Sequence, residues 1–231
     1  MAVLDAIRSA VLMTTGTRLT EVFSAGDQVG MEMADLANEV AADIAASHQW
    51  QGLQKIGTLV GDGIRTAFDK PADYDRMLIL SGMQSQSSPF WDYEHVKSID
   101  EWIARLNGGF TTGRNGWIMF GDQFQFNPAP TGTALYPYIS SYWARSAAGE
   151  AKAGFAADDD EFVLPERLMK LGLIWRWREM KGLEYAEDMA SYEAALSQHQ
   201  TRDAGPAHII RRSMIGRELN TSRAWPWVLG E

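Results

Sequence analysis

Residues able to do acid–base or metal chemistry are sparse and scattered in this chain of 231 residues. The four histidines are His48, His95, His199 and His208, and no two of them are spaced to meet on one turn of a helix. There are no cysteines, which excludes disulfide scaffolds, thiolate metal sites and cysteine nucleophiles. The motifs of zinc proteases, P-loop proteins and serine hydrolases are also absent. We therefore expect no catalytic site, no cofactor and no metal ion.

Two segments resemble ligand sites in composition only. The acidic run DDDE, residues 158–161, could hold a cation, but it lacks the alternate spacing and central glycine of an EF-hand loop. A solvated loop is the simpler interpretation. The stretch NGGFTTGRNG, residues 107–116, leads into a strand-like run, so no helix N-terminus faces an anion there. We interpret His48, beside Trp50, as a packing or capping residue rather than a base.

Hydrophobic periodicity predicts the helices that must position any functional surface. The expected helices cover residues 3–13, about 27–47, about 165–180 and about 184–200. A fifth, short helix follows the capping box Ser98-x-x-Glu101 and runs to about Leu106.

The middle of the chain has the alternation and turn residues of strands. QKIGTLVGDGIRTAFD, residues 54–69, places two β-prone runs around a Gly-Asp-Gly sequence, which predicts a tight hairpin. Residues 117–145 contain three strand-like runs, which predict a small antiparallel meander. Tyr136, Tyr138 and Tyr142 share one face of it. We expect that face to pack on a core or a neighbour rather than to stack on sugars or bases.

The helix expected at 165–180 carries apolar residues on two opposite sides. One stripe contains Leu164, Leu168, Leu171 and Trp175, and the other contains Met169, Leu173, Trp177 and Met180. A surface helix buries one stripe, so this helix is central in its own domain or touches a second body. Gly182 separates it from the next helix. We assign packing between helices or between subunits to Leu171, Trp175, Trp177, Tyr185, Met189 and Tyr192.

Together these elements predict an α+β fold that is mainly α: a helical bundle interrupted by a small antiparallel β-rich insertion, with an extended C-terminal arm. Residues 1–50 and 158–200 would form the bundle, 51–157 the insertion with its short helix, and 201–231 the arm. No apolar run approaches the length of a membrane span. Asp5 and Arg8 interrupt the first segment where a signal peptide needs apolar residues.

Charge is distributed unevenly along the chain. The net charge of −9 argues against generic binding to a polyanionic backbone, because affinity there comes from neutralising phosphates. Residues 201–231 nevertheless hold five arginines against three acids. Disorder is one interpretation of this tail. Its large apolar residues favour a second, in which it docks on an acidic partner or on a neighbouring copy.

Several segments, in the same order, resemble the head–tail adaptor (connector) proteins of tailed bacteriophages, a group that includes the tail tubular A type. They are ANEVAADIAASHQWQGL (37–53), DKPADYDRML (69–78), the meander, and DDDEFVLPERLMKLGLIWRWREMKGLEYAEDMASYEAAL (158–196). The resemblance implies a structural virion protein that is not an enzyme and is assembled in the cytoplasm of the host bacterium.

The resemblance also implies a homo-oligomeric ring of twelve copies beneath the portal protein, with a tail or nozzle protein below. DNA would pass through the channel without specific binding, and no membrane would be involved. A C-terminal arm would reach into the portal. From position and chemistry we assign this docking to Ile209, Ile210, Arg211, Arg212, Arg217, Trp225 and Trp227.

Three alternatives stay open. Another neck or tail-completion protein of the same virion would show the same elements. A glycan hydrolase would need two carboxylates a fixed distance apart in a cleft, one of them with a raised pKa. A carbohydrate-binding protein would need exposed, coplanar Tyr and Trp rings on the meander.

Overall fold

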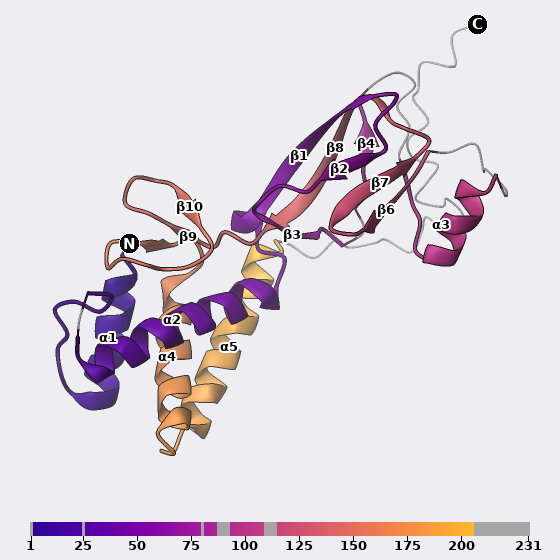
Figure 1. The fold of residues 1–231 in the computed structure, drawn as a ribbon. Coiled ribbons are helices and arrows are strands. Elements are labelled where there is room, and N and C mark those ends of the chain that lie inside the picture. The colour runs from indigo at the N-terminus through magenta and orange to yellow at the C-terminus, as the bar shows by residue number, and fades with distance from the viewer. Residues whose placement is uncertain (1, 25, 80, 87–92, 109–114, 206–231) are drawn as a thin grey trace, which may run out of the picture.

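The computed structural model describes residues 2–24, 26–79, 81–86, 93–108 and 115–205. In this part of the chain, a helical bundle lies at one end of the molecule and most of the β-sheet lies at the other (Figure 1). The arm assigned to residues 206–231 and most of the glycine-rich stretch at 107–116 fall outside the described residues.

The helices lie where hydrophobic periodicity predicts them. They are α1 (Val3–Thr15), α2 (Gln28–Ser47), α3 (Ile99–Leu106), α4 (Glu166–Met180) and α5 (Ala186–Asp203), with a 3-10 turn at Gln51–Leu53. The side chain of Asp27 caps α2 by accepting a hydrogen bond from Gly30 N at 3.1 Å. Ser98 caps α3 in the same way, through Asp100 N, which confirms the predicted start of that helix. None of the described helices is long and apolar enough to cross a membrane.

The strands form three sheets among the described residues. The strands are β1 (Gln54–Asp62), β2 (Ala67–Asp69), β3 (Tyr74–Met77), β4 (Gln84–Ser85), β5 (Glu94–His95), β6 (Gly116–Phe120), β7 (Gln123–Asn127), β8 (Thr131–Ser140), β9 (Ala144–Arg145), β10 (Ala151–Lys152) and β11 (Glu161–Phe162). One sheet has the order β1-β8-β3, with β4 also on β8; the others are β2-β7-β6-β5 and β10-β9-β11.

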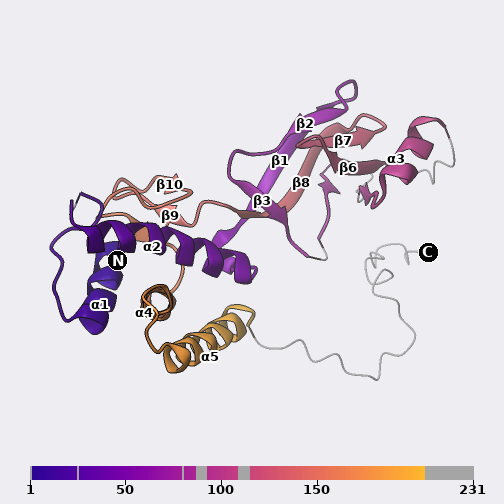
Figure 2. The same ribbon diagram turned by 60° about the horizontal axis from the view of Figure 1, so that its bottom comes forward.

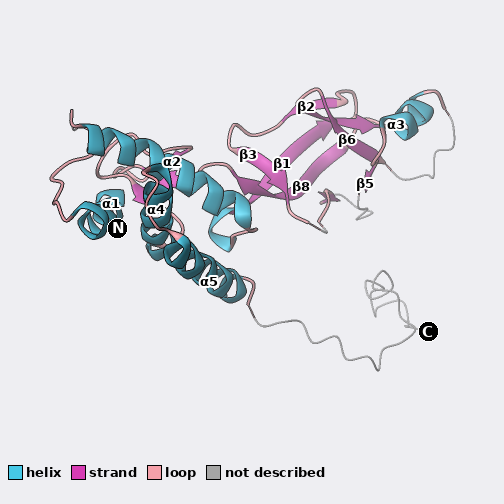
Figure 3. Cartoon of the chain, turned by 90° about the horizontal axis from the view of Figure 1, so that it is seen from below, coloured by secondary structure: helices cyan, strands magenta, loops and turns pink. Residues whose placement is uncertain are grey.

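The prediction of a mainly α fold with a small β insertion was wrong. The described chain contains five helices and eleven strands, so the fold is α+β with substantial sheet (Figure 3). Many of these strands are only two or three residues long, and some of them, such as β2 and β4, pair with strands about fifty residues away in sequence. Such short runs have no alternation of their own, so their contribution to the sheets was underestimated.

The hairpin predicted at residues 54–69 was also wrong. β1 instead pairs with β8 in an antiparallel ladder from Gln54↔Ile139 to Asp62↔Thr131, while β2 pairs with β7. Two glycines of β1 are explained by this ladder, because a Cβ atom at Gly57 would lie 2.3 Å from Tyr136 Cζ. One at Gly61 would lie 2.2 Å from the carbonyl oxygen of Pro130. The expected meander likewise divides, with β6 and β7 in one sheet and β8 in another.

An aromatic core joins the two four-stranded sheets. Its buried residues are Leu59, Phe68, Tyr74, Met83, Tyr93, Trp117, Phe124, Phe126, Ala134, Tyr136 and Tyr138. The ring of Phe124 lies 5.5 Å from that of Tyr74, edge to face, and 5.1 Å from that of Tyr136. Tyr136 and Tyr138 are only 3% and 5% exposed. These two rings are therefore unavailable for stacking on a sugar.

The third sheet belongs to the core of the bundle. Trp143, Ala144 and Phe155 are buried with the helices, and the ring of Trp143 lies 4.9 Å from that of Phe155. The start of α1 is attached to the same sheet, because Val3 N donates a hydrogen bond of 2.7 Å to the carbonyl oxygen of Asp160. Figure 2 shows β9 and β10 above α2, with α4 and α5 below it.

Candidate partner-binding surfaces

Helix α4 is central in the bundle. It contacts α1, α2 and α5, and its buried residues are Leu168, Met169, Gly172, Leu173, Ile174 and Trp177. These contacts cover most of both apolar stripes within one chain, while Met180, at the end of the second stripe, stays 51% exposed. Gly172 permits a close approach of α4 to α2, since a Cβ atom there would lie 2.5 Å from Val40 Cγ1 in α2.

The six residues assigned to packing lie on two kinds of surface. Leu171, Trp175, Trp177 and Tyr192 belong to the bundle core or pack against it. The ring of Trp175 is 6.0 Å from that of Tyr192 and 6.5 Å from that of Tyr185, so aromatic contacts link α4 to α5. Tyr185 and Met189 are half-buried and line a hollow at the surface.

Ion pairs connect the turn end of the α4–α5 hairpin to α2 and connect α4 to α5. Arg176 Nη2 lies 2.8 Å from Asp43 Oδ2, and Lys181 Nζ lies 2.7 Å from Glu32 Oε2, both on α2. Arg178 pairs with Asp188 across the turn. Burial lowers the pKa of Arg176, but the hydrogen bond and charge of Asp43 raise it more. The cations in the last turn of α4 thus have specific partners as well as a favourable helix dipole.

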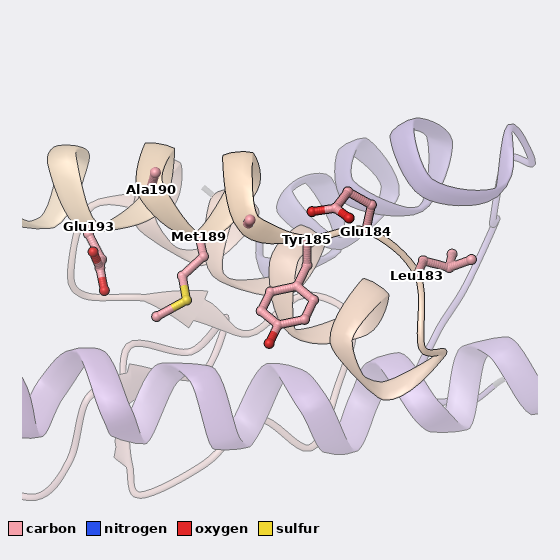
Figure 4. Close-up of a pocket in the computed structure, with 7 residues that line it drawn as sticks. Leu183, Glu184, Tyr185, Met189, Ala190 and Glu193 are labelled. Carbon is pink, nitrogen blue, oxygen red and sulfur yellow. The ribbon is translucent and has the colours of Figure 1, made fainter.

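The turn end of the hairpin carries a shallow hollow of about 440 Å³ (Figure 4). Tyr185, Met189 and Glu193 point to the same side of α5, with Leu183 and Glu184 in the preceding turn. Leu183 is 50% exposed. Within the described chain, Glu184 and Glu193 have no ion-pair partner.

The open end of the hairpin, where α4 begins and α5 ends, carries a second hollow of about 490 Å³. It is lined by Trp50, Gly52, Val163, Leu164, Pro165, His199, Arg202 and Asp203. Burial, together with the charges of Arg202 and Arg167, lowers the pKa of His199. Two arginines therefore lie near His199 at this end, where the lining also contains Asp203.

Asp203 attaches the end of α5 to the connection between α2 and β1. Its Oδ2 accepts a hydrogen bond of 2.9 Å from Gln51 N and lies 3.5 Å from His48 Nε2. His48 is the C-cap residue of α2, and its ring is 5.1 Å from that of Trp50, edge to face. This placement agrees with the packing and capping role expected for His48.

The acidic run is part of the structure rather than a solvated loop. Asp158 Oδ1 accepts hydrogen bonds from Val22 N at 3.0 Å and Phe23 N at 3.1 Å. Asp160 is 1% exposed; its Oδ2 lies 2.7 Å from both Lys152 Nζ and Ala156 N. No cluster of three or more His, Asp or Glu residues in the described part of the chain is arranged to hold a metal ion.

Two polar networks in the β-rich part were missed by sequence reasoning. Asp73 accepts hydrogen bonds from Lys55 Nζ (2.5 Å), Ser140 Oγ (2.8 Å) and Tyr138 Oη (3.0 Å). Arg105 of α3 is buried, and its Nη2 lies 3.0 Å from Glu94 Oε2. The sequence gives no signal for the first network, because its members are dispersed between residues 55 and 140.

Apolar side chains are also exposed on the β-rich part. Ile99, Ile103 and Leu106 form a stripe at helical spacing on α3, whose Trp102 is buried. Ile56 and Val60 lie on the outer face of β1. Exposed aliphatic groups grouped in this way mark interaction surfaces more often than active sites.

These features are those of a protein that binds other proteins, and a comparison of sequences agrees. The family described as SU10 adaptor protein matches residues 1–212, which span all five helices and all three sheets of the described chain. The chain belongs to the SU10 adaptor protein family. No curated protein matches it.

As a member of the SU10 adaptor family, the protein is a structural component of a bacteriophage virion. The family agrees with the resemblance to phage head–tail adaptors at that level. The match includes Ile209, Ile210, Arg211 and Arg212 of the assigned arm, and it ends before Arg217, Trp225 and Trp227. All seven residues lie outside the described part of this SU10 adaptor.

Proposed function

We propose that this adaptor forms a dodecameric ring that joins the portal protein to the tail and encloses the DNA channel, in the manner of tail tubular A proteins. The observation that carries the proposal is the family match, which extends over the bundle and the β-rich part. The proposal keeps three units: the bundle of residues 1–50 and 158–200, the insertion of 51–157, whose Trp143, Ala144 and Phe155 pack in the bundle core, and the arm of 201–231. Assembly takes place in the host cytoplasm.

The charge of the chain supports a conduit that does not hold DNA. The net charge is −9, and five of the arginines are in residues 201–231, so the rest of the chain is more acidic still. An acidic wall repels the phosphate backbone and lets DNA slide, because tight binding needs phosphate neutralisation. DNA passes through without specific binding.

The arm supplies the contact with the portal in this proposal. Ile209, Ile210, Trp225 and Trp227 provide apolar groups, and Arg211, Arg212 and Arg217 provide charge. A segment of this composition gains affinity by burying its apolar groups while its arginines pair with carboxylates on the partner. A tail or nozzle protein binds the opposite side of the ring.

To test the proposal, the purified protein is mixed with its cognate portal and the product is imaged by electron cryomicroscopy. A variant ending at Gly205 removes residues 206–231 of the arm but keeps Asp203 and its contacts with Gln51. A twelvefold ring with the full chain, and none with the shortened chain, is the expected result. A ring with both chains would reject the docking role of the arm, and no complex with either would reject the adaptor function.

A further inference from the structure

We propose that the α4–α5 turn of one copy docks into the open-end hollow of the next copy. The inference rests on the proposed ring, because a contact between different surfaces of identical chains repeats from copy to copy. It assigns a contact between subunits to two surfaces that have no partner within the described chain.

The open-end hollow is shaped and charged to receive a small apolar group next to an acid. Its volume of about 490 Å³ is in the range of pockets that hold a ligand. Val163, Leu164 and Pro165 supply apolar lining, with Arg202 and His199 beside them. Asp203 is also in the lining, but its carboxylate is already engaged by Gln51 N and His48.

The turn end of the hairpin offers the complementary shape. Met180 and Leu183 are exposed by 51% and 50%, so two large apolar side chains lie at the surface on either side of Gly182. Glu184 follows directly, and Glu187 and Glu193 are exposed on the first turns of α5. Docking would bury Leu183 against the apolar lining and place Glu184 near Arg202.

Charge complementarity remains after the ion pairs within the chain are taken into account. At the turn end, Arg176, Arg178 and Lys181 are paired with acids of the same chain. Glu184 and Glu193 at the same end have no ion-pair partner among the described residues. At the open end, Arg167 and Arg202 have no ion-pair partner among the described residues. The two ends therefore attract each other between copies, which favours one relative orientation.

The geometry excludes the same contact within one chain. The two ends are separated by the whole of α4, whose 15 residues extend for roughly 22 Å at the usual helical rise. The contact is also smaller than a complete interface. It would therefore act mainly after the portal has gathered the copies, which raises their effective concentration.

The arm that leaves α5 beside the hollow is a poorer occupant. Arg202 and Asp203 already line the hollow, and the remaining residues 206–231 carry four arginines and two acids, so their net charge has the same sign as Arg167 and Arg202. Like charges brought together in this way oppose binding. The acidic turn of a second copy is favoured on the same argument.

Charge reversal tests the contact in the presence of the portal. Arg202→Glu and Glu184→Arg should each raise the protein concentration for half-maximal ring formation at least about tenfold, since a close interfacial charge pair is worth more than 1.4 kcal/mol. Both changes together should restore assembly to within about threefold of the original chain. Glu150→Arg, an exposed site on the β9–β10 connection, is the control and should have no effect.

Disulfide trapping can be measured without the portal, because a covalent link accumulates even from a weak and transient contact between copies. The chain has no cysteines, so Gly52→Cys with Leu183→Cys introduces one defined pair. Under mild oxidation by oxidised glutathione, the pair should link copies into a ladder longer than a dimer, while either single variant stops at dimers.

The two experiments separate the two proposals. No ladder, or single charge variants that assemble as well as the original chain, would reject the docking contact and leave the ring intact. A failure of the original chain to bind the portal would reject the proposed function, while a ladder would still establish the contact. A charge-reversed pair no better than its single variants would also reject the contact.

Discussion

Gly172 in α4 leaves no room for a side chain beside Val40 in α2, because a Cβ atom at position 172 would lie 2.5 Å from Val40 Cγ1. This approach lets one helix pack against α1, α2 and α5 at once. The two helices thus approach each other closely at a residue that has no side chain.

Gly172→Ala should therefore destabilise the protein. Overpacking a well-packed core costs typically ~1–3 kcal/mol, and the better helix propensity of alanine offsets about 1 kcal/mol of it. Urea unfolding followed by circular dichroism measures the change. Gly26→Ala is the matched control, because a Cβ atom there meets nothing within 4 Å. Equal stability of the Gly172→Ala variant and the original chain would show that the strain against Val40 is no larger than the gain in helix propensity.

Asp73 should make the folded protein sensitive to acid. Burial raises the pKa of its carboxyl, but hydrogen bonds from Lys55, Ser140 and Tyr138 outweigh burial and leave the pKa below its ordinary value. The stabilisation is complete above the pKa of the unfolded chain, about 3.9, and is lost as the pH falls through the lower folded value.

Asp73→Asn should cost roughly 1.5–3 kcal/mol at pH 7, the usual range for hydrogen bonds to a charged group. The variant should also lose part of its stability difference between pH 7 and pH 3. Urea unfolding at both pH values gives the comparison, with the exposed Asp75→Asn as control. An unchanged pH dependence would mean that Asp73 titrates as in the unfolded chain.

Arg105 should hold α3 on the sheet. Burial lowers its pKa, but Glu94 and Glu101 raise it more, so the buried guanidinium stays charged and paired. Arg105→Ala should cost roughly 1–3 kcal/mol and speed hydrogen exchange of the α3 amides. Lys70→Ala breaks the exposed pair with Asp122 and should cost at most ~1 kcal/mol. Equal hydrogen-exchange rates of the α3 amides in the Arg105→Ala and Lys70→Ala variants would contradict this role of Arg105.

Adjacent residues of the acidic run should behave differently. Asp160 is buried and accepts hydrogen bonds from Lys152 and two backbone amides, which hold its pKa low although burial raises it. Asp160→Asn should lower the free energy of unfolding by about 1–3 kcal/mol, whereas exposed Asp159→Asn should change it by less than about 0.5 kcal/mol. Similar melting temperatures for the two variants would indicate that Asp160, like Asp159, behaves as part of a solvated loop.

Local sequence signals located the helices but not the partners of the strands. Asp27 and Ser98 cap helices whose apolar residues recur every three or four positions, and such signals lie within one segment. β1 has a clear alternation of buried and exposed residues, and its ladder with β8 begins at Gln54↔Ile139. The sequence near residue 54 does not indicate which strand pairs with β1. Turn chemistry at residues 61–63 suggested the nearer partner, and the fold class was misjudged with it.

The candidate surfaces were predictable to the extent that they lie on one helix. Two stripes on α4 indicated a central helix, and Trp175 and Tyr192 do meet between α4 and α5. The open-end hollow is lined by Trp50, Pro165 and Arg202, which come from three segments that are distant from one another in the sequence. The network of Asp73 is equally non-local. Distances between such residues come only from the tertiary fold, so sequence spacing gives no access to them.

The long ladder of β1 with β8 and the contact of α1 with α4 have a consequence for synthesis on the ribosome. When residues 1–62 have emerged, α1 and β1 exist without α4 (Glu166–Met180) and β8 (Thr131–Ser140), the elements that bury them. The chain must therefore wait until most of it has been translated before either core closes. Until then, an unpaired strand with exposed Ile56 and Val60 is open to aggregation, and host chaperones that cover such segments should raise the yield of folded adaptor.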